Sequence, residues 1–76
     1  MNLDNFEGIN RIFTMIEAEQ LTGVDRSTIK VWIKRYSLPI EIIGNAYQFK
    51  YDDLKMIERL KGKTPQEKTY IIQMQR

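Results

Sequence analysis

Apolar residues recur at helical spacing in four stretches of this chain, and a helix-start signal precedes or opens each stretch. Thr14 and Glu17 have the spacing of a capping box, which predicts a first helix that runs to about Leu21. Gly23 is expected to end that helix, because glycine readily takes the positive φ angle of a helix C-terminus. The pattern therefore predicts a short helix followed at once by a tight turn.

The second helix is predicted over residues 26–36. Asp25 is its expected N-cap, and Val24 and Ile29 have the spacing of a hydrophobic staple. The helix should end before Pro39, because the residue that precedes a proline disfavours the α region. Its apolar positions form one i, i+3, i+4, i+7 stripe, which we expect in the core: Ile29, Trp32, Ile33 and Tyr36.

A β-hairpin is predicted next, with short β-prone runs at 40–43 and 47–49. Gly44-Asn45 between the runs is typical of a tight hairpin turn. Because side chains alternate along a strand, Tyr47 and Phe49 share one face and are expected to point inward. A two-stranded hairpin is marginal alone, so it must pack against the helices.

Two further helices complete the pattern. Asp52 and Asp53 open the third, where the helix dipole favours carboxylates, and Gly62 ends it. Capping is therefore preferred over an acid–base role for this pair. Residues 64–67 form another capping box with proline at the first helical position, and the fourth helix is expected to run to residue 76. The predicted fold class is mainly α with a small β-hairpin.

Composition excludes several classes of function. The chain has 76 residues and contains neither Cys nor His, so it lacks a disulfide framework, the usual zinc ligands and the commonest general base. We therefore expect no enzyme activity, no metal and no cofactor. The longest apolar runs fall well short of the roughly 18 residues of a membrane span, and the acidic N-terminus is unlike a signal peptide. These features predict a cytoplasmic protein without membrane contact.

The charge is unevenly distributed along the chain. Residues 26–35 hold four basic side chains and no acidic one, whereas residues 1–25 hold five acidic side chains and one basic one. Most charge runs are solvated helix faces. For the basic residues of 54–63 a solvated face and a contact with phosphates are both open. On the second helix of a helix–turn–helix, however, a basic block is typical of phosphate binding.

Two short helices joined by a three-residue turn with a glycine predict a helix-turn-helix, whose second helix enters the major groove. We expect base readout near its N-terminus and backbone contacts farther along, with the hairpin as a wing beside the groove. Tyr47 is expected either in the core or at a phosphate. The candidate DNA-binding residues of the second helix are Arg26, Ser27, Lys30, Val31, Lys34 and Arg35. Those of the first helix and the wing are Thr14, Asn45, Tyr47, Gln48 and Lys50.

Residues 13–61 resemble a MerR-type winged helix-turn-helix. The resemblance rests on Leu21-Thr22-Gly23-Val24 followed by Thr28-Ile29 and Trp32, and it continues through Leu38-Pro39, 44–49 and Asp53-Leu54 at matching spacing. The wing and third helix are also similar to those of chromosome-anchoring relatives.

The resemblance implies about four helices plus a two-stranded wing, binding double-stranded DNA as a homodimer. On this reading 1–12 form an N-terminal tail, 13–61 the DNA-binding domain and 62–76 a C-terminal helix for dimerisation.

Two residues depart from the family pattern. Glu19 stands where a small residue usually lets the two helices approach, so it needs a partner or a splayed turn. Gln48 stands where the wing usually carries arginine, which weakens one phosphate contact. The lack of Cys and His excludes the family's metal or thiol sensing within this chain.

The resulting hypothesis is sequence-specific DNA binding by a transcriptional regulator, with control of its own operon as one version. A DNA-segregation or plasmid-maintenance protein and an excisionase-like architectural factor use the same domain. A protein-interaction module that has lost DNA binding is the alternative of another class, favoured by Glu19, Gln48 and the acidic residues of 1–25. Leu3, Phe6 and Ile9 suggest a docking turn, but disorder is the preferred expectation for this terminus.

Overall fold

Helices make up most of the chain in this computed structural model, which describes residues 3–74. The expected extension of the last helix to residue 76 lies outside the described residues. The elements in chain order are the 3₁₀-helix η1 (Leu3–Phe6), α1 (Met15–Thr22), α2 (Arg26–Arg35), β1 (Glu41–Ile43), β2 (Ala46–Gln48), α3 (Tyr51–Leu60) and α4 (Pro65–Met74). This confirms the predicted class, a mainly helical winged helix-turn-helix with a two-stranded hairpin.

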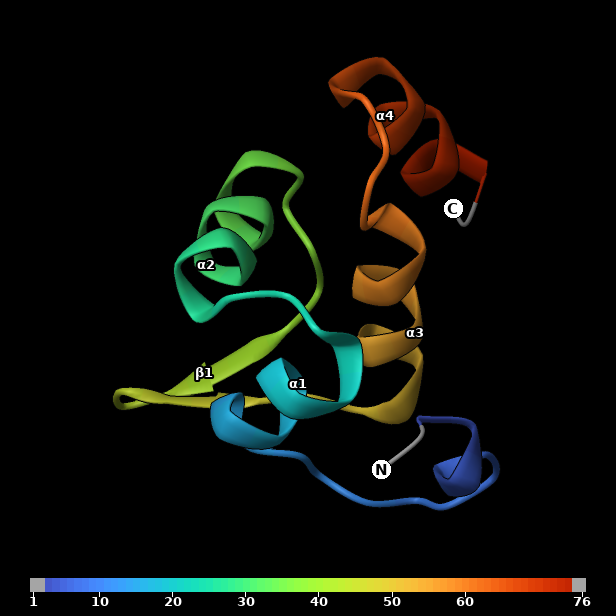
Figure 1. Cartoon of the computed structure of the whole chain (residues 1–76). Helices are drawn as coiled ribbons and strands as arrows, with labels where there is room; N and C mark the ends of the chain where they lie inside the picture. Colours follow the sequence, from blue (N-terminus) through green and yellow to red (C-terminus); the bar gives the residue numbers. More distant parts are fainter. Residues whose placement is uncertain (1–2, 75–76) are drawn as a thin grey trace.

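Helix α1 lies at the centre and contacts α2, α3 and β2. Figure 1 shows α2 and the hairpin on one side of α1, with α3 and α4 on the other. The two sides of the molecule therefore carry different elements, and α2 with the hairpin forms one of them. No helix within residues 3–74 has the length and apolar character needed to cross a bilayer.

The caps of the helix-turn-helix form as the sequence predicts. Glu17 N donates to Thr14 Oγ1 at 3.2 Å, and Thr14 N donates to Glu17 Oε1 at 3.0 Å, which completes the capping box. Gly23 ends α1 at φ 73° with its N–H on the carbonyl of Glu19. The Asp25 carboxylate then accepts from Ser27 N at 3.0 Å and starts α2.

The end of α2 is set by Ser37 rather than by Pro39 alone. Ser37 has φ 51° and is the only described non-glycine residue with a positive φ. The N–H of Leu38 then reaches back to the carbonyl of Ile33 at 3.1 Å, the bond of a Schellman motif. This reversal places Leu38 in the core with 7% of its surface exposed. A serine thus occupies the left-handed position that usually belongs to glycine.

The hairpin pairs in antiparallel register, with Ile42 opposite Tyr47, and Gly44 takes a φ of 62° in its turn. A further antiparallel bridge, which the sequence pattern did not predict, joins Phe13 to Phe49. The amide of Phe13 donates to Phe49 O at 2.7 Å, and the amide of Phe49 donates to Phe13 O at 3.1 Å. The wing is therefore hydrogen-bonded to the residue just before the capping box of α1.

The core is built from side chains of η1, α1, α2, α3 and α4 and of the residues between them. Its fully buried large side chains are Phe13, Phe49, Leu3, Ile29, Leu54, Ile57 and Leu60. The preferred expectation of disorder at the N-terminus is wrong for the described part, because Leu3 is 1% exposed and η1 contacts α3. Phe6 also packs edge-on against Phe13, with ring centroids 5.3 Å apart. Of the docking turn that the sequence suggested, Leu3 and Phe6 therefore pack against the rest of the protein, whereas Ile9 is 46% exposed. The local pattern did not identify the partners, α3 and Phe13.

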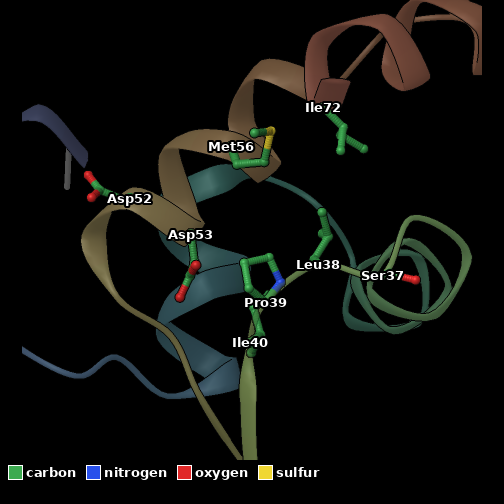
Figure 2. A pocket seen from close by; sticks show the side chains of 8 residues that line it. All are labelled: Ser37, Leu38, Pro39, Ile40, Asp52, Asp53, Met56 and Ile72. Atoms are coloured by element: carbon green, nitrogen blue, oxygen red, sulfur yellow. The ribbon is translucent and has the colours of Figure 1, made fainter. Parts of the chain in front are cut away.

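A groove runs between the segment 37–40, α3 and α4 (Figure 2), and Leu38, Met56 and Ile72 are among its lining residues. Asp52 and Asp53 stand at its edge, and Figure 2 shows their carboxylates pointing apart. Asp53 Oδ2 accepts from Lys50 N at 2.9 Å, which confirms its capping role. Burial raises the pKa of Asp53, although the bond from Lys50 opposes the shift.

Candidate nucleic-acid interface

The exposed face of α2 carries every residue that the sequence assigned to it. Two adjacent rows run along this face at a spacing of four residues, which is close to one helical turn. The first row is Arg26, Lys30 and Lys34, and the second is Ser27, Val31 and Arg35, all exposed. The opposite face is core, as expected, with Ile29 at 0% and Trp32 at 8% exposure. The helix therefore presents a basic surface about 12 Å long beside the hairpin.

One surface hollow brings together predicted residues from three separate elements. It is lined by Thr14 at the start of α1, Arg26 at the start of α2, and Asn45, Tyr47 and Gln48 of the wing. These are the parts of a winged helix-turn-helix that were expected at the DNA. Their convergence makes this hollow and the face of α2 one continuous candidate interface.

Tyr47 connects the hollow to the core. Its ring stacks on Phe49 with centroids 6.2 Å apart and an interplanar angle of 14°. Lys30 Nζ lies 5.8 Å from the centroid of the same ring, so α2 and the wing also contact each other through a cation–π pair. Tyr47 is half-buried, which leaves both expected roles, core packing and surface contact, compatible with its position.

Lys50 is separate from this group. It is exposed, but it lines a different depression together with 8–11 and the first residues of α3. The hollow also contains two exposed isoleucines that were not among the candidate residues. Ile12 is 48% and Ile16 is 57% exposed. Exposed apolar side chains beside a capping box were the available signal, and only the folded arrangement places them next to Arg26.

Glu19 has the partner that its unusual position requires. The guanidinium of Arg26 donates to Glu19 Oε1 from Nε at 3.1 Å and from Nη2 at 2.9 Å. The backbone N–H of Arg26 donates to Glu19 Oε2 at 3.1 Å. These bonds lower the pKa of Glu19, because they stabilise the ionised carboxylate. Glu19 therefore links α1 to the first turn of α2.

The remaining cations of α2 are available to an external anion. Among residues 3–74, the ion pairs join Arg11 to Glu17, Arg26 to Glu19, and Lys55 to both Asp4 and Glu58. None of these pairs involves Lys30, Lys34 or Arg35. Three positive charges on one exposed helix face, without an internal counter-charge, form a site for phosphates.

The comparison with known families agrees with this geometry. Residues 13–62 match the family described as MerR HTH family regulatory protein, and the match runs from the bridge residue Phe13 through the end of α3. No curated protein and no solved structure gave a significant match. The match spans well over half of the chain and includes both helices of the helix-turn-helix and the wing. The chain therefore belongs to the MerR helix-turn-helix family of DNA-binding regulatory proteins.

Proposed function

We propose that this protein is a sequence-specific binder of double-stranded DNA that acts as a transcriptional regulator, with its own operon as one target. The observation that carries the proposal is the exposed basic face of α2, which stands beside the wing in the arrangement of a winged helix-turn-helix. Such a face fits the major groove, while the wing follows the adjacent backbone. On this proposal the protein acts on the nucleoid, in the cytoplasm.

The two ends of α2 have different tasks in this proposal. Arg26, Ser27 and Lys30 lie in the first turns, which approach the base edges most closely. Arginine and lysine suit the O6 and N7 acceptors of guanine. Lys34 and Arg35 lie at the far end of the helix and bind phosphates. Base contacts would give sequence preference, and phosphate contacts would give most of the salt-dependent affinity.

Residues from α1 and the wing position α2 on the duplex. Thr14, Asn45 and Gln48 share the hollow with Arg26, so they would meet the backbone that borders the groove. Lys50 lies outside the hollow and would reach a phosphate farther along. Gln48 lacks the positive charge of arginine, so its contact would contribute less affinity and less salt dependence.

Homodimerisation through the region 62–76 is part of the proposal. Tyr70 and Met74 stand one turn apart on α4 and are 64% and 62% exposed. Two apolar side chains on one exposed helix face suit a contact with a second copy of the chain. A two-fold dimer would then recognise two half-sites related by inverted symmetry.

The test is a binding selection with the full chain on a pool of random duplexes at moderate salt. We expect an enriched motif with inverted symmetry, bound at least a hundredfold more tightly than its scrambled version at the same salt. Arg26→Ala should cost about 1–3 kcal/mol and relax the preference at one base pair. Lys34→Ala should weaken binding to all sequences alike and reduce the salt slope by about one.

Arg59→Ala is the matched control, because it removes one exposed positive charge from α3. We expect it to leave both the motif and the affinity nearly unchanged. Equal losses on motif and scrambled DNA for Arg26→Ala and Lys34→Ala would contradict the division of tasks along α2. Binding without enrichment would indicate non-specific coating of DNA, and the absence of binding would favour a protein-interaction module.

A further inference from the structure

The carboxylate of Glu19 poses a problem for the proposed interface, since it places a negative charge beside the first basic residue of α2. The pair is accessible, with 50% of the Arg26 side chain and 27% of the Glu19 side chain exposed. We infer that Glu19 is a positioning and specificity-determining residue: it holds one edge of the Arg26 guanidinium so that the opposite edge is presented to guanine. This inference rests on the proposed function.

The geometry of the contact fixes the orientation of the guanidinium. Glu19 Oε1 accepts from both Nε and Nη2 of Arg26, at 3.1 and 2.9 Å. Glu19 Oε2 accepts from the backbone N–H of the same residue at 3.1 Å. One carboxylate therefore binds both the tip and the backbone of Arg26. A side chain attached at both ends has few rotamers left, and less entropy is lost when it binds a base.

Arg26 keeps the donors that base recognition needs. A guanidinium has five N–H donors arranged around a plane. Glu19 occupies the edge formed by Nε and Nη2, so the N–H groups that remain on Nη1 and Nη2 form a second edge. Guanine accepts two parallel hydrogen bonds at O6 and N7. Arg26 can thus bind Glu19 with one edge and guanine with the other, and neither contact displaces the other.

The charge of Glu19 changes the relative affinity of Arg26 for phosphates and for guanine. A single arginine on an exposed helix is attracted to any phosphate, whatever the sequence. The adjacent carboxylate cancels most of that attraction at a distance, whereas the short, directional bonds to a guanine edge are kept. Arg26 also lines the hollow that it shares with Asn45 and Gln48, so the oriented group lies within the candidate interface. Glu19 would therefore lower affinity for random DNA and raise discrimination.

The experiment compares the unsubstituted chain with Glu19→Ala and Glu19→Gln on three duplexes: the selected motif, the motif with the Arg26-dependent guanine replaced, and a scrambled sequence. We expect Glu19→Ala to bind scrambled DNA more tightly and to lose about tenfold in the ratio of motif to scrambled affinity, concentrated at that base pair. The salt slope on scrambled DNA should steepen by about one as the released Arg26 engages a phosphate. Glu58→Gln, which removes a carboxylate from α3, is the matched control.

A double-mutant cycle with Arg26→Ala separates positioning from a general charge effect. In the Arg26→Ala background the loss of discrimination caused by Glu19→Ala should disappear, because the group that Glu19 orients is gone. Glu19→Gln keeps the shape of the side chain and one acceptor oxygen. It provides the comparison if the alanine variant folds poorly, and it should show a smaller loss in the same direction.

Two results would overturn the inference. Unchanged discrimination in Glu19→Ala and Glu19→Gln would show that Glu19 only joins α1 to α2. If Glu19→Ala bound all three duplexes more tightly and had a higher ratio of motif to scrambled affinity, Glu19 would mask Arg26 rather than position it. Both outcomes differ from failure of the proposed function, in which the wild-type protein itself selects no motif.

Discussion

Replacement of Ser37 by glycine should stabilise the protein. Ser37 has φ 51°, in the left-handed region where the Cβ atom of an L-residue crowds the following carbonyl. The side chain is exposed, so the substitution removes no buried contact. The backbone bond from Leu38 to Ile33 that closes the end of α2 does not involve the serine hydroxyl, and glycine can form it equally well.

Two opposing effects set the magnitude. The left-handed conformation costs a residue with a Cβ atom roughly 1–2 kcal/mol, and glycine avoids most of this cost. Glycine also makes the unfolded chain more flexible, which takes back about 0.4–1 kcal/mol. For Ser37→Gly we therefore expect a net gain of about 0.5–1 kcal/mol in the free energy of unfolding. In a domain of this size that gain raises Tm by about 2–8 °C.

Thermal and urea unfolding, both followed by circular dichroism, measure this change. Ser37→Ala is the control, because alanine keeps the Cβ atom and removes only the hydroxyl. We expect the alanine variant to lie within about 0.5 kcal/mol of the wild type. If glycine were neutral or destabilising while alanine was destabilising, the hydroxyl rather than the backbone angle would govern this turn, and the reasoning would be refuted.

Two further predictions concern the N-terminal segment and the acid limb of stability. Leu3→Ala should lower the free energy of unfolding, measured in urea, by about 2–3 kcal/mol, because it leaves a cavity at a buried site. Asn5→Ala is the control, since Asn5 is exposed and its replacement should have little effect. Equal, small effects of the two substitutions would show that the segment is not part of the core. The backbone bond from Thr14, and secondarily Arg11, lowers the pKa of Glu17, and the bonds from Thr64 do the same for Glu67. Their contribution to stability is therefore complete above the ordinary pKa of a glutamate and is lost as pH falls through the lowered, folded-state pKa. Glu17→Gln should flatten the decline of Tm between pH 6 and pH 3, and parallel curves for the two proteins would contradict this assignment.

The sequence predicted best those structural features whose interacting residues lie within a few positions of each other in the chain. The capping boxes at 14–17 and 64–67 and the cap at Asp25 formed as expected, because donor and acceptor are two or three residues apart. The Phe13–Phe49 bridge was not predicted, and for Leu3 disorder was preferred over the docking turn that its spacing with Phe6 and Ile9 suggested. Each depends on segments that are far apart in the chain, and their residue types are ordinary for many other surroundings.

Part of the candidate interface could also be predicted, because its residues repeat at short spacing along one helix. Helical periodicity separates the exposed row of Arg26, Lys30 and Lys34 from the core stripe without any knowledge of the fold. The sequence also indicated that Glu19 needed a partner, but it did not identify Arg26, seven residues away across the turn. Nor did it show that Lys50 lies outside the hollow that holds the other candidate residues of the wing, Asn45, Tyr47 and Gln48.

The bridge between Phe13 and Phe49 has a consequence for the shape of the DNA that fits. Two backbone hydrogen bonds tie the end of the wing to the residue that precedes α1. Glu19 on α1 in turn accepts a hydrogen bond from the backbone N–H of Arg26 at the start of α2. On the proposed mode of binding, the distance between the helix in the groove and the wing on the backbone is therefore fixed before contact. A duplex whose groove width does not match this distance would have to bend or change its groove, so the flexibility of its base steps would be selected as well as their hydrogen-bonding edges.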